Sequence, residues 1–137
     1  MYYQTSAGIL EITVSGQQIK RAIFINNAEI SSTENPTLDM SKISFDGTPF
    51  QIKVWQAALT IPKGETRTYH ELAQMIGNPK AYRAVANALG QNKIAYFIPC
   101  HRVIRKDGSL GGYKWGIEIK KTLLQSEGVK KGAIKNI

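Results

Sequence analysis

The first 27 residues alternate between apolar and polar positions, which is the pattern of β-strands with one buried face. Leu10, Ile12 and Val14 are separated by polar residues, and Ser15-Gly16-Gln17 is a turn signal. The alternation resumes in residues 19–25. This pattern predicts a β-hairpin. Because an isolated hairpin is marginally stable in water, it must pack against another part of the chain.

A polar segment then predicts a linker. Residues 28–47 are rich in Ser, Asn and Asp and contain Pro36. We expect a boundary near Gly47, which separates a short N-terminal β lobe with its linker (1–47) from a second domain (48–137).

Three segments with the apolar spacing of helices follow. The first two begin at the capping-box residues Thr48 and Thr68, and breakers at Pro62 and Gly77 mark their ends. The third covers residues 81–89. The positions expected to face the core are Phe50, Val54, Trp55, Ala58, Leu59, Leu72, Met75, Ile76, Val85, Ala88 and Leu89.

The second and third of these helices are joined by a short turn that contains Gly77, as in a helix-turn-helix. The third would be the recognition helix. Its outward residues are Ala81, Arg83, Ala84 and Asn87, where the small residues permit close approach and the arginine could reach a phosphate or a groove. Plain helix packing with a solvated arginine explains the same pattern, so the geometry alone leaves both interpretations open.

Short strands and turns are expected after the third helix. Residues 94–98 predict a buried strand that ends at Pro99, and residues 103–104 predict another. The basic segment 105–109 has the Asp-Gly signature of a hairpin tip. Such a tip resembles the wing of a winged helix-turn-helix, in which Arg105 would contact phosphates.

A glycine-rich loop with two aromatic residues comes next. Tyr113 and Trp115 lie within residues 111–116, where the glycines allow a close approach of backbone to a ligand. Either ring could stack on a base or close the core. The loop lacks a Walker pattern, which excludes a nucleotide-phosphate loop of that kind.

A final helix is predicted for residues 117–126, and Glu127 follows it. A carboxylate at this end opposes the helix dipole, so Glu127 is a candidate functional residue. The basic tail 130–135 is expected to be mobile. The helix is expected to turn Ile119, Leu123 and Leu124 inward.

Composition and charge favour a packed protein with a polyanionic partner. The chain has 137 residues, of which 42% are hydrophobic, and this excludes a disordered chain. Residues 1–47 carry three basic and five acidic side chains, a net charge of −2, whereas residues 48–137 carry a net charge of +10. This asymmetry points to nucleic acid, although a generally basic surface remains the alternative.

The single cysteine, Cys100, is followed by His101 and Arg102. A thiol reacts as the thiolate, which neighbouring imidazole and cationic groups favour. A buried free cysteine is the alternative. One cysteine excludes an intrachain disulfide, and with His70 and His101 it is too small a set for a closed zinc site. Without a signal peptide or an apolar run of bilayer length, we expect a soluble cytoplasmic protein, associated with the nucleoid if it is prokaryotic.

The arrangement of these motifs resembles the methylated-DNA–protein-cysteine methyltransferases, the O6-alkylguanine-DNA alkyltransferases, over residues 47–128. Pro99-Cys100-His101-Arg102-Val103 looks like their active-site signature. The other matching segments are Gly77-Asn78-Pro79-Lys80-Ala81 with Arg83-Ala84-Val85, Gly112-Tyr113-Lys114-Trp115-Gly116, and Leu123-Leu124 with Glu127-Gly128. The fold class implied is α/β, of the α+β kind, with a small N-terminal sheet and a winged helix-turn-helix-like domain.

The resemblance implies repair of DNA by direct reversal of damage. A protein of this kind flips O6-alkylguanine out of the duplex and takes the alkyl group irreversibly onto cysteine, in one turnover and without a cofactor or metal. O4-alkylthymine stays open as a second substrate. The implied partner is double-stranded DNA, bound by a monomer through the minor groove with little sequence specificity, and no membrane is involved.

The same resemblance assigns roles to individual residues. Cys100 would be the nucleophile, His101 its base through a water, and Glu127 the group that orients the imidazole. Asn92 would support the site, Tyr69 would donate a proton to the purine, and Arg83 would fill the gap in the duplex. The base pocket would be lined by Val103, Tyr113 and Lys114, and Trp115 would narrow its rim. Further DNA contacts would come from Ala81, Ala84, Asn87 and Arg105.

Three other interpretations compete with this one. A non-catalytic lesion-binding relative lacks the nucleophile, which is present here as Cys100. A winged helix-turn-helix regulator needs neither the Cys-His pair nor Glu127. A thiol hydrolase would turn over repeatedly. The N-terminal part is also short for the family, and it lacks the ligands of the zinc site found in the human relative.

Overall fold

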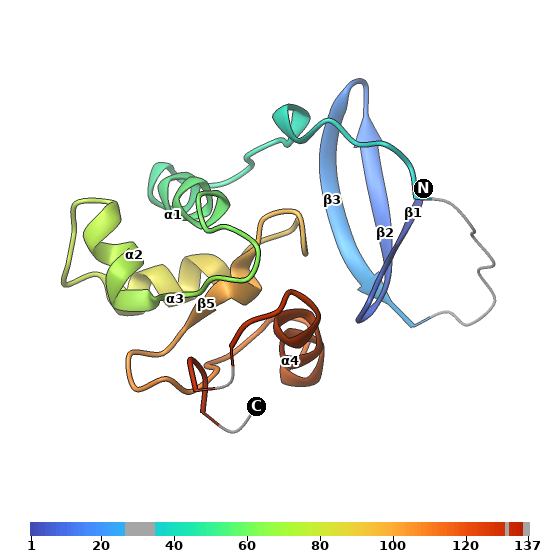
Figure 1. Ribbon diagram of the computed structural model, residues 1–137. Helices are drawn as coiled ribbons and strands as arrows, with labels where there is room; N and C mark the ends of the chain where they lie inside the picture. Colours follow the sequence, from blue (N-terminus) through green and yellow to red (C-terminus); the bar gives the residue numbers. More distant parts are fainter. Residues whose placement is uncertain (27–34, 131, 136–137) are drawn as a thin grey trace.

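The computed structural model describes residues 1–26, 35–130 and 132–135. The N-terminal part forms an antiparallel sheet in the order β1-β2-β3, made of β1 (Tyr2–Thr5), β2 (Gly8–Ser15) and β3 (Gln18–Ile25) (Figure 1). The predicted hairpin is therefore confirmed as β2 and β3, and β1 adds a third strand that the pattern did not indicate.

A bulge changes which residues of β3 face the core. Thr13 pairs with Arg21 whereas Val14 pairs with Ile19, so Lys20 is an extra residue in β3. An extra residue shifts the alternation of side chains by one position. Ile19 and Ala22 are consequently both buried, and the even alternation predicted for residues 19–25 is wrong.

The second part of the chain is mainly helical. Its helices are α1 (Pro49–Leu59), α2 (Tyr69–Met75), α3 (Tyr82–Gly90) and α4 (Ile117–Ser126). Two short strands, β4 (Arg67–Thr68) and β5 (Val103–Ile104), pair in parallel, and two 3₁₀ turns, η1 (Met40–Lys42) and η2 (Cys100–Arg102), complete the elements. No helix in the described part of the chain is both long and apolar enough to cross a bilayer.

The helix starts follow from local chemistry. Thr48 and Thr68 each accept a hydrogen bond from the backbone of the residue three positions later, and the side chains of Gln51 and Glu71 bond back. Both predicted capping boxes are thus confirmed. The core between α1 and α3 includes Trp55, whose indole Nε1 donates to the carbonyl of Ala88 over 2.8 Å.

Further expectations about the fold are also wrong. Residues 94–98 form turns instead of a strand, with a single bridge between Ile94 and Ala22. The turn at 105–109 closes through a bond from the Arg105 amide to the Ser109 carbonyl, but no strand follows it, so it is not a β-wing. Two residues expected to face the core are exposed. Met75 is exposed because the short helix α2 turns Leu72 and Ala73 inward, and Leu59 is exposed at the last position of α1.

The expected mobility of the basic tail stays a prediction, but two of its described residues contact the rest of the protein. Ile134 is only 3% exposed and packs near Ile104 and Leu124, and the Lys135 amide donates to the Gly108 carbonyl. Of the predicted linker, residues 28–34 lie outside the described residues, whereas Ile43 forms a bridge with Ile19.

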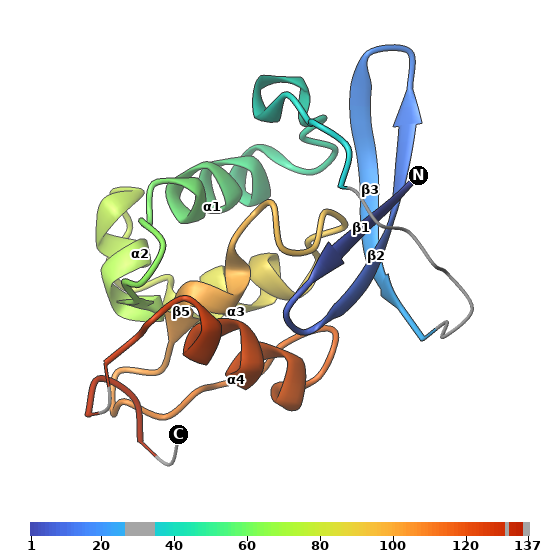
Figure 2. The same cartoon turned by 45° about the vertical axis from the view of Figure 1, so that its right-hand side comes forward.

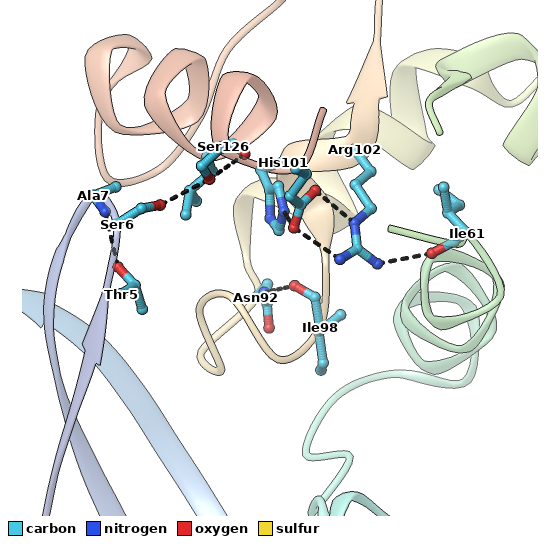
Figure 3. A network of polar contacts seen from close by, with 11 residues as sticks. Thr5, Ser6, Ala7, Ile61, Asn92, Ile98, His101, Arg102 and Ser126 are labelled. Atoms are coloured by element: carbon cyan, nitrogen blue, oxygen red, sulfur yellow. Dashed lines mark hydrogen bonds and ion pairs between the residues drawn. The ribbon is translucent and has the colours of Figure 1, made fainter. Parts of the chain in front are cut away.

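The sheet is attached to the helical part through the loop that precedes the cysteine (Figure 2). The Ala22 amide donates to the Lys93 carbonyl over 3.0 Å, and the Ala95 amide donates to the Ala22 carbonyl over 2.8 Å. A second link joins the Ser6 and Ser126 hydroxyls, 2.8 Å apart, at the end of α4 (Figure 3). Both attachments lie close in sequence to predicted site residues.

Candidate active site

Cys100 lies at the first position of η2, directly after Pro99, and is 6% exposed. It forms part of the wall of a cavity of about 280 Å³. The other lining residues are Tyr69, Ala86, Asn87, Leu89, Gly90, Gly112, Tyr113 and Lys114. The recognition helix and the glycine-rich loop therefore contribute to the same cavity as the thiol, and four other predicted site residues (Tyr69, Asn87, Tyr113 and Lys114) meet there.

Asn92 holds the sulfur and the loop that carries it. Its Nδ2 lies 3.3 Å from Cys100 Sγ and 3.1 Å from the Ile94 carbonyl, and its Oδ1 accepts from the Ile94 amide over 2.9 Å. A longer bond of 3.4 Å reaches the Ile98 carbonyl. A buried amide with these partners fixes the path of residues 92–100 and donates a proton toward the sulfur.

His101 and Arg102 both bind Glu127, and Figure 3 shows this network beside η2. The His101 Nε2 lies 3.0 Å from Glu127 Oε2. The Arg102 guanidinium binds both carboxylate oxygens, at 2.9 and 2.8 Å, and donates to the Ile61 carbonyl over 2.8 Å. Glu127 thus tolerates its dipole-disfavoured position because a fixed guanidinium pairs with it.

Burial alone would raise the pKa of Glu127, but the hydrogen bonds from Arg102 and His101 outweigh it and hold the pKa at about 2. An ionised carboxylate only accepts hydrogen bonds, so His101 Nε2 carries a proton and Nδ1 holds a lone pair. Burial lowers the pKa of His101, which keeps the imidazole neutral. The buried His101 Nδ1 has no hydrogen-bond partner among the described residues, so it is free to accept a proton.

Burial raises the pKa of the Cys100 thiol to about 12, although the Asn92 hydrogen bond and the charge of Lys120 act in the opposite direction. The sulfur therefore carries its proton at rest. A reaction at this sulfur needs a base that accepts the proton, and the neutral imidazole of His101 follows directly in the chain.

Lys120 is a site residue that the sequence analysis missed. Its ammonium is fully buried and donates to the carbonyls of Val103, Leu110 and Gly112. Burial lowers the pKa of Lys120 to about 7, whereas three carbonyl bonds favour the charged form. Lys120 thus joins β5, next to the thiol, to the glycine-rich loop. The only signal in the sequence was its position between inward-facing Ile119 and Leu123.

Tyr69 and Gly111 are in close contact at the cavity. A Cβ atom at Gly111 would lie 2.7 Å from the Tyr69 hydroxyl oxygen, and the φ of Gly111 is +71°. Glycine is therefore required there both for its backbone conformation and for space. Burial raises the pKa of Tyr69, so its hydroxyl keeps its proton and is able to donate it.

The helix-turn-helix presents a second hollow beside this cavity. Arg83 lies at its edge, together with Arg105 from the turn after β5. The hollow has a volume of about 380 Å³ and is lined by Tyr69, His70, Tyr82, Arg83, Ala86, Arg105, Lys106 and Asp107. Two predicted DNA contacts, Arg83 of α3 and Arg105 of the basic turn, thus line one hollow, even though the turn is not a β-wing. Asn87 lines the cavity of the thiol instead, and Ala81 and Ala84 line neither.

Two predicted substrate contacts lie away from the cavity wall. Val103 is fully buried in the core. Trp115 packs edge-on against Phe24 and Tyr113, with ring centroids 6.2 and 5.4 Å apart. Neither residue lines the cavity, and their roles remain predictions. The arrangement as a whole defines a class: a buried thiol with a neutral imidazole and a paired carboxylate, set in a cavity beside a helix-turn-helix.

Comparison with known proteins identifies the family within this class. Residues 49–129 match the DNA-binding domain of the 6-O-methylguanine DNA methyltransferases. A probable methylated-DNA–protein-cysteine methyltransferase of Acanthamoeba polyphaga mimivirus is 42% identical over 139 residues, which cover 90% of this chain and 93% of that protein. The chain therefore belongs to the methylated-DNA–protein-cysteine methyltransferase family, whose members repair alkylated DNA by direct reversal.

Two further relatives extend this comparison. The structure of Mycobacterium tuberculosis OGT in complex with DNA has a TM-score of 0.77 with 34% sequence identity, over 98% of this chain and 94% of that chain. The Escherichia coli protein Ada, a bifunctional transcriptional activator and DNA repair enzyme, is 59% identical over 81 residues, which are 59% of this chain. The match spans only 23% of Ada, about a quarter of that protein.

Proposed function

We propose that the chain repairs duplex DNA by transferring the alkyl group of O6-alkylguanine to Cys100, once per protein molecule. The observation that carries this proposal is the position of Cys100 Sγ, in the wall of a cavity formed by α3 and the glycine-rich loop and 3.3 Å from the amide of Asn92. The match of residues 49–129 to the family's DNA-binding domain supports the choice of substrate.

In the proposed reaction the sulfur attacks the alkyl carbon, so a C–S bond forms as the C–O6 bond breaks. The thiol proton passes through a water to His101 Nδ1, which has no other partner among the described residues. The electron pair of the broken bond stays on the guanine, and a proton from the Tyr69 hydroxyl neutralises it. Glu127 stabilises the imidazolium that results. The thioether is stable, which makes the transfer irreversible.

The DNA would lie across α3 and the turn at residues 105–107. In this proposal a monomer binds the minor groove, where the small side chains of Ala81 and Ala84 permit close approach. Arg83 fills the gap that the flipped base leaves, and Asn87 and Arg105 add polar and charged contacts. The alkyltransferase unit corresponds to residues 48–137, and the N-terminal sheet supports it through the loop before Cys100.

Intact-protein mass spectrometry tests the proposal. After mixing with an excess of duplex that contains O6-methylguanine, the protein should gain the mass of one methyl group, mapped to Cys100. The Cys100→Ser variant should gain none. An unchanged mass with tight binding to the lesion duplex would indicate a non-catalytic lesion-binding protein instead. An unchanged mass with no preference for the lesion would leave a DNA-binding domain alone.

A further inference from the structure

Tyr96 has an unusual backbone conformation close to the candidate active site. Its φ is +71°, and among the residues that the structure describes it is the one non-glycine residue with a positive φ. For a tyrosine this conformation is strained and persists only where the surrounding structure enforces it. Contacts of Tyr96 with the surrounding structure must therefore hold it in this conformation.

The Tyr96 ring lies beside the His101 imidazole and is nearly parallel to it. The two ring planes are nearly parallel, at 7°, with centroids 6.1 Å apart, which is an offset stack. Tyr113 meets the same imidazole edge-on at 6.3 Å, and Glu127 binds its Nε2. His101 is therefore held by a carboxylate at one nitrogen and by two aromatic rings around the rest of the ring.

The other contacts of Tyr96 lead to the N-terminal sheet. Its ring lies 6.0 Å from that of Tyr3 in β1 and 5.3 Å from that of Phe97, and Tyr3 and Phe97 meet edge-on at 5.0 Å. The backbone of Ala95 is also hydrogen bonded to Ala22 in β3. The sheet thus holds the segment that carries Tyr96 through both its backbone and its side chains.

We propose that Tyr96 is a positioning residue for His101: its strained backbone places the phenol ring beside and parallel to the imidazole, where it fixes the ring orientation and shields this side of the ring from bulk solvent. The effect on alkyl transfer rests on the proposed function, whereas the effect on His101 itself does not. The N-terminal sheet acquires a role through this contact, because Tyr3 supports Tyr96 from behind.

The proposal predicts how His101 titrates. Burial is the main cause of the lowered pKa of His101, so removal of the adjacent Tyr96 ring, which exposes the imidazole to more solvent, should raise that pKa. The charged and titratable groups around the imidazole are Glu127, Arg102, Lys120, Tyr96, Tyr113 and the adjacent Cys100. A variant at Tyr96 leaves the other five side chains in place, so a shift in the pKa of His101 reports on the loss of the tyrosine.

NMR of the wild-type protein, without DNA, gives the first test. The chain has two histidines, and a His70→Gln variant assigns the signals of His101. We expect nuclear Overhauser effects between the ring protons of Tyr96 and of His101. Their absence would overturn the proposal without any variant, and it would leave the proposed function standing.

The second test compares three variants by imidazole titration and by the pH profile of methyl transfer. Tyr96→Asn removes the ring, and asparagine tolerates a positive φ better than most residues. It should raise the pKa of His101, move the acidic limb of the rate profile to higher pH and slow transfer by at least ~10-fold. Tyr96→Phe keeps the ring and should match the wild type in the pKa of His101, in the pH profile and in the rate of transfer.

Phe97→Leu is the control, since it removes a neighbouring ring that does not stack on His101. It should leave the titration and the profile unchanged. A folded Tyr96→Asn variant with the wild-type titration and profile would overturn the proposal. If Tyr96→Asn does not fold, the Overhauser contacts and the behaviour of Tyr96→Phe still decide the question. A wild-type protein that transfers no methyl group would refute only the proposed function.

Discussion

Arg102 and Glu127 form a two-pronged ion pair, with Arg102 Nε 2.9 Å from Oε1 and Nη2 2.8 Å from Oε2. The third contact of the guanidinium, to the Ile61 carbonyl, fixes its plane. His101 binds the same carboxylate, so the orientation of the imidazole depends on an arginine that follows it directly in the chain.

A lysine at position 102 cannot make this arrangement, because an ammonium is a point charge without the planar fork of arginine. We expect Arg102→Lys to lower the free energy of unfolding by about 2–4 kcal/mol, measured by urea denaturation at pH 7. Arg67→Lys is the matched control, since Arg67 pairs over 3.2 Å with the exposed Glu65 and such a pair contributes less than about 1 kcal/mol. Equal losses in the two variants would contradict the structural role of Arg102.

The low pKa of Glu127 also predicts how the stability of the folded protein depends on pH. Its pKa is about 2 in the folded protein, against an ordinary value of 4.5. The unfolded chain therefore takes up the proton first as the pH falls. The contribution of the carboxylate, on the order of 3 kcal/mol, is complete above pH 4.5 and is lost between pH 4.5 and 2.

Urea denaturation at pH 7, 5, 4 and 3 measures this loss. The Glu127→Gln variant should be less stable at pH 7 and should lack this part of the pH dependence. Glu118→Gln, which removes an exposed carboxylate from the same helix, should keep the wild-type dependence. A Glu127→Gln variant with the wild-type slope would show that another group causes it.

The parts of the fold that local chemistry controls were predictable from the sequence. The helix starts at Thr48 and Thr68 depend on side chains close to them in the chain. The strand predicted for residues 94–98 failed because an apolar run alone cannot distinguish a strand from buried turns. The positive φ of Tyr96 and the hydrogen bonds of Asn92 depend on contacts with other segments.

The candidate site was predictable where residues carry a recognisable motif, as at Cys100 and His101. The motif did not indicate what holds these residues. Lys120 lies in a helix whose pattern suggests a solvated lysine, and only the fold brings three carbonyls to it. The contact between Gly111 and Tyr69 joins segments 42 positions apart, and no local pattern reveals it.

Because Gly111 contacts Tyr69, a substitution at Gly111 tests whether the position of Tyr69 matters. A methyl group at residue 111 would lie 2.7 Å from the tyrosine hydroxyl, and φ is +71° there. We expect Gly111→Ala to lower stability by about 1–3 kcal/mol and to slow methyl transfer, because Tyr69 must move. Gly16→Ala is the control: φ is +61° and no atom lies within 4 Å, so it has the backbone strain without the collision. If Gly16→Ala slowed transfer as much, displacement of Tyr69 would not be the cause.

Lys120 should contribute to both stability and reaction. Lys120→Met keeps the aliphatic chain but leaves three carbonyls without their donor, which we expect to lower the unfolding free energy by about 2–5 kcal/mol. The same change frees Gly112, which lines the cavity, so methyl transfer should slow in single-turnover measurements. Lys121→Met removes a neighbouring, less buried ammonium and should have little effect on either quantity. A Lys120→Met variant of wild-type stability would rule out the bridging role.

The surface shared by α3 and the turn at residues 105–107 should bind DNA chiefly through phosphates. Each lysine or arginine that neutralises a phosphate releases counterions, so affinity falls with salt in proportion to the number of such contacts. Arg105→Ala should weaken binding to an undamaged duplex and reduce the slope of log affinity against log salt by about 1 between 50 and 200 mM salt. Lys42→Ala removes the same charge from η1, in the N-terminal part, and should keep the slope. Affinity that does not change with salt in the wild type would rule out binding through phosphates. Equal slopes for Arg105→Ala and the wild type would show that Arg105 contacts no phosphate.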